Sequence, residues 1–301
     1  MKAALIGYGY WGKIIEKYIC DSTYFDLAAV CSPELDNNGI YTKDLEKLMY
    51  DPQLEAVFIC TPVSTHFDIC KKFLESGKHI FCEKPTVKTL EQFQILKNLA
   101  VKTHRILYTD YIYTVSPSIQ KMKSLLKKIG NIQVISGEIR QFGRFYEEDD
   151  VFEVLGIHLL SVAAFFLNSI SVQTIQYDPW DKASPCLSGR IEIRFDNGTI
   201  ADLACSSIYP DKIRRIVVQG TKGILIFDMY GKQTLRYFPY SRQAHFCVPE
   251  KEESWQFDEG NNLQRAIKQF GALCDGEIDP TNLVLSECVI KLLDRRKEFV
   301  I

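Results

Sequence analysis

The stretch from Lys2 to Gly12, KAALIGYGYWG, decides the fold of this chain. A short, mostly apolar run leads into the Gly-x-Gly-x-x-Gly spacing of Gly7, Gly9 and Gly12, and an amphipathic stretch follows as far as Cys20. In a strand–turn–helix unit, the first glycine permits the tight turn, the second lets the backbone approach a pyrophosphate, and the third lets helix and strand pack closely. The N–H groups and the dipole of the helix then face the phosphates. The stretch therefore predicts a dinucleotide-binding loop. Its candidate cofactor-binding residues are Gly7, Tyr8, Gly9, Tyr10, Trp11 and Gly12.

Length, charge and cysteine content narrow the class of protein. The 301 residues suffice for two domains, and a formal net charge of −2 argues against a general nucleic-acid binder. No apolar run reaches the length of a membrane span and no charged secretory leader precedes the first strand. We therefore expect a cytoplasmic protein with no nucleic-acid partner and no membrane partner. The ten cysteines never form Cys-x-x-Cys, which favours buried free thiols over disulfides or a metal site.

Strands and helices alternate through the first hundred residues. Short, almost fully apolar runs predict strands at Lys2–Ile6, Leu27–Cys31, Ala56–Ile59, His79–Cys82 and Ile106–Thr109. Helices are predicted at Gly12–Cys20, Thr65–Ser76 and Leu90–Lys102, with Gly77 as the cap of the second. This pattern predicts a doubly wound parallel sheet, with its ligand at the carboxyl ends of the strands.

The end of the second strand bears on which dinucleotide is used. Ser32 occupies the position where an acidic residue would accept hydrogen bonds from the adenosine ribose. Glu34 follows two residues later, and the nearest basic residue that could face a 2′-phosphate is Lys43. The sequence therefore leaves NAD and NADP open. The Asn- and Gly-containing stretch Pro33–Tyr41 predicts a loop in place of the next helix.

Polar residues close three further strands. Thr61-Pro62 follows the third strand, Glu83-Lys84-Pro85 the fourth, and Asp110 the fifth. An ammonium group at Lys84 beside a nicotinamide could lower the pKa of a substrate hydroxyl or polarise a carbonyl. Taken alone, however, a lysine in a turn is more often simply solvated.

Together these motifs make the chain resemble the glucose-fructose oxidoreductase, inositol dehydrogenase and rhizopine-catabolism family (Gfo/Idh/MocA), in the branch associated with surface-polysaccharide and sugar-nucleotide metabolism. The resemblance rests on the glycine loop, on Thr61-Pro62 with His66, on Glu83-Lys84-Pro85, and on later stretches from Thr109 to Gly130 and from Arg214 to Gly223. It implies a Rossmann domain over residues 1–112 and a substrate-binding and oligomerisation α+β domain over 113–301. The additional cofactor-binding residues that it implies are Ser32, Thr61, Pro62, His66, Glu83 and Lys84.

The second domain is expected to contain an open, mostly antiparallel sheet, and the sequence supports this independently. Strands are predicted at Gln133–Gln141, Val172–Tyr177, Leu187–Phe195, Thr199–Ser206, Ile213–Gln219, Gly223–Phe227 and Thr234–Phe238. Asn197-Gly198 predicts a two-residue hairpin. Helices are predicted at Val151–Leu167, Asn261–Cys274 and Leu283–Glu298, besides one that begins at Ser116-Pro117. The resemblance implies a homodimer or homotetramer formed through the exposed face of this sheet.

The catalytic question centres on His158. The family resemblance assigns a general acid or base to this histidine, an orienting aspartate one turn earlier, and Lys84 nearby. Val154 stands at the aspartate position and cannot accept a proton. With 3.6 residues per turn, Glu153 points about a quarter-turn away, whereas Asp150 lies two turns back and Asp110 could approach from the fifth strand. On an apolar helix face, His158 could equally be a buried core histidine.

These residues lead to one main functional hypothesis and two alternatives. The main hypothesis is an NAD(P)-dependent dehydrogenase or reductase that transfers hydride between nicotinamide and a hydroxyl or keto carbon of a sugar or nucleotide sugar. Its catalytic residues are Lys84 and His158. Its substrate-binding candidates are Asp110, Tyr113, Arg140 and His158. The alternatives are a catalytically impaired dinucleotide-binding regulatory or assembly protein, which Val154 favours, and a glycosidase that uses transient oxidation.

Overall fold

Six parallel strands form the sheet of the first unit. The computed structural model describes residues 1–143, 145, 147, 149–168, 171–243 and 245–296, and the chain divides into two compact units, of which the first comprises Met1–Ile112 and Asn261–Asp294. The strand order is β3-β2-β1-β4-β5-β6. The strands are β1 (Lys2–Ile6), β2 (Asp26–Cys31), β3 (Tyr41–Thr42), β4 (Ala56–Ile59), β5 (His79–Cys82) and β6 (Leu107–Thr109). The helices are α1 (Tyr10–Cys20), α2 (Leu45–Tyr50), α3 (Val63–Glu75), α4 (Leu90–Thr103), α7 (Asn262–Cys274) and α8 (Thr281–Asp294).

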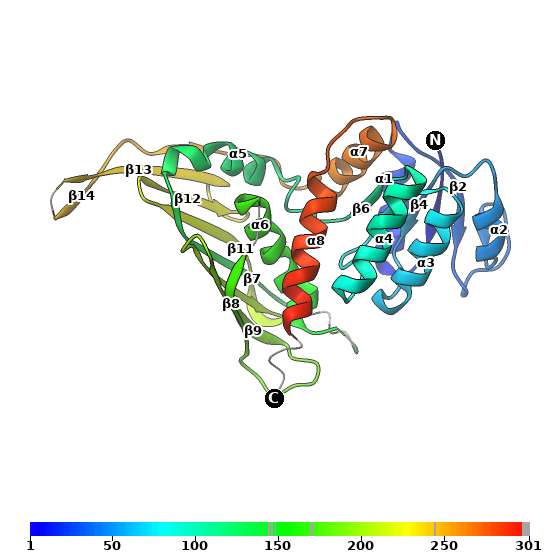
Figure 1. Cartoon of the computed structure of the whole chain (residues 1–301), viewed down its shortest axis with the longest axis horizontal. Helices are drawn as coiled ribbons and strands as arrows, with labels where there is room; N and C mark the ends of the chain where they lie inside the picture. The colour runs from blue at the N-terminus through cyan, green and yellow to red at the C-terminus, as the bar shows by residue number, and fades with distance from the viewer. Residues whose placement is uncertain (144, 146, 148, 169–170, 244, 297–301) are drawn as a thin grey trace. The chain divides into compact units, whose positions relative to one another are not determined.

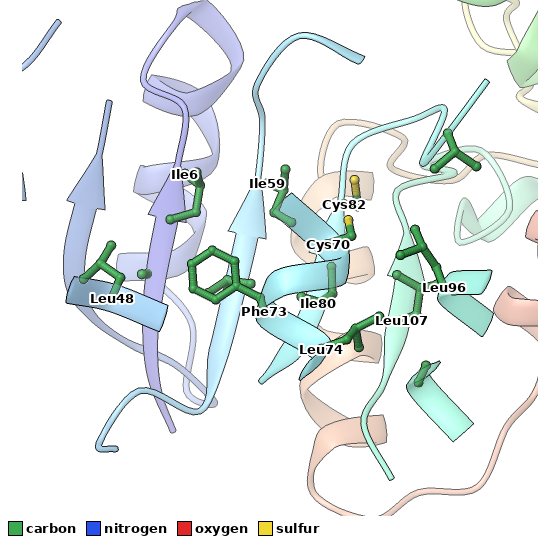
Figure 2. Packing of buried hydrophobic residues seen from close by; sticks show 14 of the residues in the cluster. Ile6, Leu48, Ile59, Cys70, Phe73, Leu74, Ile80, Cys82, Leu96 and Leu107 are labelled. Carbon is green, nitrogen blue, oxygen red and sulfur yellow. The ribbon is translucent and has the colours of Figure 1, made fainter. Parts of the chain in front are cut away.

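Helices cover both faces of this sheet, because successive residues of each strand point to opposite sides. On one face, Phe73 and Leu74 of α3 and Leu48 of α2 belong to one buried cluster with the strand residues Ile6, Ile59 and Ile80 (Figure 2). The helices α2, α3 and α4 of this face are visible in Figure 1. On the other face, an aromatic cluster of the first unit joins strands to α7. Its members are Phe25, Phe58, Phe81, Tyr108 and Phe270. The doubly wound parallel sheet predicted from the sequence is confirmed.

Two features of the first unit differ from the sequence-based expectation. The loop after β2 leads into the short strand β3 and the helix α2, neither of which was predicted. The helices α7 and α8, which we assigned to the second domain, pack within the first unit. The reason is physical: Phe270 of α7 lies in the aromatic cluster, and Asn282 of α8 hydrogen-bonds the backbone of Thr109. Residues 297 and 298, the end of the predicted last helix, lie outside the described residues.

The second unit, residues 113–260 with Arg295 and Arg296 among the described residues, contains a mixed sheet of nine strands. The path of its order is β14-β13-β12-β11-β7-β10-β9-β8, and β15 pairs with β13. The strands are β7 (Ile132–Phe142), β8 (Val172–Pro179), β9 (Ser188–Phe195), β10 (Ile200–Ser206), β11 (Ile208–Gly220), β12 (Gly223–Asp228), β13 (Leu235–Gln243), β14 (Phe246–Pro249) and β15 (Glu253–Trp255). Only the pair of β7 and β10 is parallel. The predicted mostly antiparallel sheet is confirmed, whereas β14 and β15 were not predicted.

Helices pack on one face of this second sheet. They are α5 (Pro117–Leu125), the 3-10 turn η1 (Leu126–Ile129), the π-helical turn η2 (Phe152–Gly156) and α6 (Ile157–Leu167). Gly137 of β7 makes room for Leu159 of α6, because a Cβ at Gly137 would stand 2.6 Å from Cδ2 of Leu159. The neighbouring residues Ile135 and Ile139 point the same way and are buried. This side of the sheet therefore forms the core of the second unit, as the ribbon in Figure 1 illustrates.

The hairpin between β9 and β10 has a loop one residue longer than predicted. Phe195 donates its N–H to the carbonyl of Thr199 at 2.9 Å, so the loop consists of Asp196, Asn197 and Gly198. Gly198 has a φ of +83°, which fits a type I turn followed by a left-handed residue. The glycine thus serves the turn, but as its third residue.

The ten cysteines are all free thiols. Five of them are buried, namely Cys31, Cys70, Cys82, Cys186 and Cys205. Cys20 and Cys247 are exposed, so the expectation of buried thiols is wrong for these two.

Candidate functional site

The carboxyl ends of the first sheet bring the sequence-predicted residues of the first unit to one edge. In the order β2-β1-β4-β5-β6, the residues that follow the strands are Ser32, Gly7, Thr61, Glu83 with Lys84, and Asp110. Ligands of doubly wound sheets bind in the crevice at this edge. The parallel topology therefore aligns positions that are up to a hundred residues apart in the sequence.

The three glycines of the first loop have different surroundings. Gly7 has a φ of +94°, and a Cβ there would lie 2.8 Å from the carbonyl carbon of Cys60. A Cβ at Gly12 would lie 2.2 Å from the carbonyl oxygen of Gly7. A Cβ at Gly9 would meet nothing within 4 Å. Gly7 and Gly12 are thus required by the fold, whereas Gly9 borders open space at the N-terminus of α1, where a pyrophosphate can approach the backbone.

The aromatic residues of the loop are held to different degrees. The hydroxyl of Tyr8 donates to Oε2 of Glu16 at 2.6 Å, and that of Tyr41 donates to Oε1 at 3.2 Å. The hydrogen bond to Glu16, followed by the interaction with the hydroxyl of Tyr41, burial and the negative charge of Glu16, raises the pKa of Tyr8. Tyr10 and Trp11 are exposed. Tyr8 therefore ties the loop to β3, and the other two rings remain accessible on the first turn of α1.

The residues after β2, where the adenosine ribose of a coenzyme would lie, do not distinguish NAD from NADP. Ser32 is buried, and its N–H donates to the carbonyl of Thr42 at 3.1 Å. Lys43 forms an exposed ion pair with Asp36 at 3.4 Å. An ion pair of this kind contributes little and can exchange for other partners.

His66 is fully buried between two loops of this edge. Its Nε2 lies 2.8 Å from the carbonyl oxygen of Thr61, and its Nδ1 lies 3.0 Å from that of Pro85. Thr61 also accepts a hydrogen bond from the hydroxyl of Thr65 at 2.7 Å, and Pro62 caps α3. His66 thus joins the loop after β4 to the Glu-Lys-Pro turn. It would influence a bound ligand by holding the backbone of these two loops in place.

Two carboxyl groups and one ammonium group meet after β5 and β6. Burial, followed by the charge of Glu83, raises the pKa of Asp110 well above its usual range. Burial also raises the pKa of Glu83, while the charge of Lys84 and a hydrogen bond from Asp110 oppose this shift. The backbone N–H of Lys84 donates to Oε2 of Glu83 at 3.2 Å. Both carboxyl groups thus have raised pKa values, and Lys84 is the cation that opposes the shift in each.

The end of β6 is fixed by groups that the sequence did not reveal. Oδ1 of Asn282 accepts from the N–H of Thr109, and its Nδ2 donates to the carbonyl of Thr109, both at 2.9 Å. The hydroxyl of Thr109 also contacts those of Thr86 at 2.5 Å and Ser286 at 2.8 Å. No local motif marks Asn282, because it reaches the site only through the packing of α8.

In the second unit, His158 lies beside Tyr113, and a buried arginine neighbours Tyr113. The rings of His158 and Tyr113 are 5.2 Å apart at 60°. Burial raises the pKa of Tyr113 to about 12, although the charge of Arg214 opposes the shift. Arg214 is 7% exposed and donates to the carbonyls of Arg140 at 2.8 Å and Ile213 at 2.7 Å, and to the side chain of Gln141. Sequence reasoning missed Arg214 as a neighbour of Tyr113.

The segment before His158 is not a regular α-helix. Residues Phe152–Gly156 form a π-helical turn, in which the N–H of Ile157 donates to the carbonyl of Phe152. A π turn holds an extra residue, so counting 3.6 residues per turn back from His158 to Val154 or Glu153 was wrong here. Asp150 accepts hydrogen bonds from the N–H groups of Phe152 at 2.9 Å and Glu153 at 3.2 Å and pairs with Arg296. Asp150 therefore caps this turn.

Arg140 does not share a face with His158. It alternates along β7 with Ile139, which points to the helix-covered side. Its guanidinium lies 3.1 Å from Glu138 and against the rings of Trp180 and Tyr209. The structure therefore groups Tyr113 with His158 and places Arg140 on the other face of the sheet.

Two absences hold for the part of the chain that the structure describes. There, no set of three or more His, Cys, Asp or Glu side chains is arranged to hold a metal ion. No helix within the described ranges combines the length and apolar character needed to cross a membrane.

Comparisons with known proteins support the same architecture. Residues 1–111 match the model of the Gfo/Idh/MocA oxidoreductase family with an NAD-binding Rossmann fold. D-glucoside 3-dehydrogenase of Escherichia coli (strain K12) is 23% identical over 245 residues, which cover 68% of this chain and 70% of that protein. UDP-N-acetylglucosamine 3-dehydrogenase of Acidithiobacillus ferrooxidans is 25% identical over 231 residues, covering 72% and 70%. Two shorter matches, 37% and 38% identical, span 21% and 20% of uncharacterized oxidoreductases.

Solved structures extend the likeness over the whole chain. That of the UDP-N-acetylglucosamine 3-dehydrogenase GnnA from Acidithiobacillus ferrooxidans has a TM-score of 0.85 at 20% identity, covering 100% of this chain and 97% of that one. GenD2 from gentamicin A biosynthesis, solved in complex with NAD, has a TM-score of 0.84 at 16% identity, covering 99% and 93%. We conclude that residues 1–111 belong to the NAD-binding Rossmann-fold domain of the Gfo/Idh/MocA oxidoreductase family, and that the chain as a whole shares the fold of these solved structures.

Proposed function

We propose that this protein is an NAD(P)-dependent dehydrogenase or reductase that acts on a CH–OH carbon of a sugar or nucleotide sugar. The observation that carries the proposal is the arrangement at the edge of the first sheet. The open backbone at Gly9 follows β1, the Lys84 turn follows β5, and β4 lies between these two strands. Such an edge can bind a dinucleotide with its pyrophosphate at Gly9 and its nicotinamide towards Lys84. Relatives that act on a glucoside and on UDP-N-acetylglucosamine support the substrate class.

In this proposal, Lys84 and His158 are the catalytic residues. Bound nicotinamide supplies the hydride acceptor or donor. The ammonium group of Lys84 stabilises the negative charge that develops on the substrate oxygen, and the imidazole of His158 exchanges the hydroxyl proton. Tyr113, which lies against His158, and Asp110, which neighbours Lys84, are proposed to contact the substrate. Arg140 lies on the other face of the sheet and is left out of the proposed substrate contacts.

The test is a panel of free sugars, glycosides and nucleotide sugars with NAD and NADP, read by nicotinamide absorbance. We expect turnover with at least one member, and we expect Lys84→Ala and His158→Ala each to lower kcat by on the order of 100-fold or more. Unchanged rates in either variant would remove that residue from the mechanism. Tight coenzyme binding without turnover across the panel would instead favour the dinucleotide-binding regulatory protein that Val154 suggested.

The proposal includes a homo-oligomer formed through the second sheet. The face opposite α6 carries half-buried apolar residues on four neighbouring strands. They are Val134, Ile200, Val217, Ile224 and Ile226. A second copy of the chain would remove this surface from water. We expect light scattering to give the mass of a dimer or tetramer, and we expect Val217→Glu combined with Ile226→Arg to reduce it. An unchanged mass would contradict this interface.

A further inference from the structure

Asp110 is a buried carboxyl group at the ligand-binding edge of the first unit. Its side chain is 3% exposed, and its backbone N–H donates to the carbonyl of Cys82 at 2.9 Å. This bond places Asp110 directly beside Glu83, the next residue on the neighbouring strand end. An isolated carboxylate at such a depth is costly, so the group needs either a partner charge or a proton.

Two neighbouring buried carboxyl groups need a proton between them. Asp110 and Glu83 follow neighbouring strands, burial and the charge of Glu83 raise the pKa of Asp110, and two ionised carboxylates have no donor between them. The titratable groups that face the pair within this unit are Lys84, Cys60, Cys82 and Tyr108. Burial raises the pKa of both thiols and of the phenol, so they stay neutral. Lys84 then balances one negative charge. Because the pKa of Asp110 is raised more strongly than that of Glu83, the proton is on Asp110 and the negative charge is on Glu83.

One oxygen of Asp110 remains for a ligand. Among the described residues, Oδ1 of Asp110 has no hydrogen-bond partner although it is buried. When the other oxygen carries the proton towards Glu83, Oδ1 is a neutral carbonyl oxygen, which accepts but does not donate. Buried acceptors are normally satisfied, so this atom indicates a donor supplied by something that binds there.

The position of this oxygen is fixed before a ligand arrives. Asn282 holds both backbone groups of Thr109, the residue before Asp110, at 2.9 Å. The hydroxyl of Thr109 is held by Thr86 and Ser286. A group fixed in this way loses little conformational entropy on binding.

We propose that Asp110 is a neutral ligand-binding carboxylic acid, which donates its proton to Glu83 and accepts, at Oδ1, a hydrogen bond from a neutral N–H or O–H group of the bound ligand. The inference rests on the proposed function, and it specifies the chemistry of that site. The donor is either the carboxamide of nicotinamide or a hydroxyl of the sugar. Both are neutral donors, and a site with a neutral acceptor selects them over an ammonium group, which would favour an ionised carboxylate.

The test compares Asp110→Asn with Asp110→Leu. The amide of Asn keeps a neutral carbonyl acceptor and an N–H donor for Glu83, whereas Leu keeps the volume and removes both. We measure the Kd of NAD⁺ by calorimetry, the KM of the sugar that the panel identifies, and the infrared carbonyl stretch of protonated carboxylic acids at neutral pH. Circular dichroism and urea unfolding confirm that each variant is folded.

The two sources of the donor give different results. If nicotinamide supplies it, the Kd of NAD⁺ rises on the order of tenfold in Asp110→Leu and stays within about threefold of wild type in Asp110→Asn. If the sugar supplies it, the same contrast appears in KM, and the Kd of NAD⁺ stays constant. In both cases the infrared band of a protonated acid is present in the wild type and lost in Asp110→Asn.

Three results would overturn the inference. They are equal losses in Asp110→Asn and Asp110→Leu, no loss in either variant for both ligands, or no infrared band that Asp110→Asn removes. The infrared and NAD⁺ measurements need no turnover, so they decide the state of Asp110 even if no sugar of the panel reacts. If Asp110→Leu does not fold, the infrared difference and the binding by Asp110→Asn remain decisive.

Discussion

At the scale of single residues, the first loop separates folding from ligand binding. A Cβ at Gly12 would overlap the carbonyl oxygen of Gly7 at 2.2 Å, whereas one at Gly9 would meet nothing within 4 Å. We therefore expect Gly12→Ala to lower the free energy of unfolding by about 2 kcal/mol or more. Gly9→Ala should leave stability nearly unchanged and weaken NAD⁺ binding on the order of tenfold, because its methyl group would stand where the pyrophosphate approaches.

The measurement for this pair is urea unfolding together with calorimetric titration of NAD⁺. Each variant serves as the control of the other, since both replace glycine by alanine within one loop. A Gly9→Ala protein that binds NAD⁺ like the wild type would place the pyrophosphate elsewhere.

A second residue-scale prediction concerns the pH dependence of stability. Burial in the folded state raises the pKa of Asp110 well above its ordinary value, so the folded protein holds this proton more tightly than the unfolded chain does. The stability that it contributes is complete below the unfolded pKa and is lost as the pH rises towards the folded pKa. Asp110→Asn has no proton to lose there. We therefore expect the free energy of unfolding of the variant, relative to wild type, to increase as the pH rises above the unfolded pKa of aspartate, about 4.

Urea unfolding at several pH values checks this. Other carboxyl groups titrate in both proteins, so the difference between them isolates position 110. A constant difference across the range would mean that folding does not raise the pKa of Asp110, contrary to the proposal that Asp110 is protonated.

At the scale of elements, α8 supports the site although it comes last in the first unit. Asn282 satisfies the N–H and the carbonyl of Thr109, both buried at the end of β6. Asn282→Ala leaves the buried N–H of Thr109 without this partner, while the carbonyl of Thr109 still accepts from the N–H of Tyr111; we expect the free energy of unfolding to fall by about 1–3 kcal/mol. Val284→Ala is the matched control, because Val284 is 44% exposed on the same helix and should change stability by less than about 1 kcal/mol.

The readout is again urea unfolding, with NAD⁺ affinity as a second measurement. We expect NAD⁺ to bind more weakly to Asn282→Ala than to Val284→Ala, since Asp110 follows the strand end that Asn282 holds. Equal stability of the two variants would show that the contacts of Asn282 contribute nothing to holding β6.

At the scale of the whole molecule, the thiols report folding. Cys20 and Cys247 are exposed, whereas five thiols are buried and three are intermediate. Burial raises the pKa of Cys60, Cys82 and Cys205, and the thiolate is the reactive form. We expect an aromatic disulfide reagent to modify Cys20 and Cys247 first in the native protein and all ten thiols after denaturation.

The double variant Cys20→Ser, Cys247→Ser is the control, and it should remove the fast phase while leaving the later one. Rapid reaction of more than the three intermediate thiols in addition to these two would indicate that the core opens readily.

The sequence by itself determined the local elements and the edge at which ligands bind. The apolar run before Gly7 and the short apolar strands after it predict a parallel sheet. They can be recognised from the sequence because the spacing and composition of apolar residues are local properties. The strand ends then place Ser32, Thr61, Glu83 and Asp110 at one edge, since all parallel strands end on the same side. The bounds of β1, β4 and β5 match the prediction residue for residue.

Only the tertiary structure decided what depends on contacts between distant segments. The π-helical turn before His158, the place of α7 and α8 in the first unit, and the contact of Arg214 with Tyr113 have no local signature. The same holds for the proton between Asp110 and Glu83, which depends on burial and on a neighbour 27 residues away along the chain. The spacing of apolar residues indicates which side of a helix or strand is buried. The desolvation and hydrogen bonding of a polar side chain depend on which distant residues pack against that side, and the sequence does not show this locally.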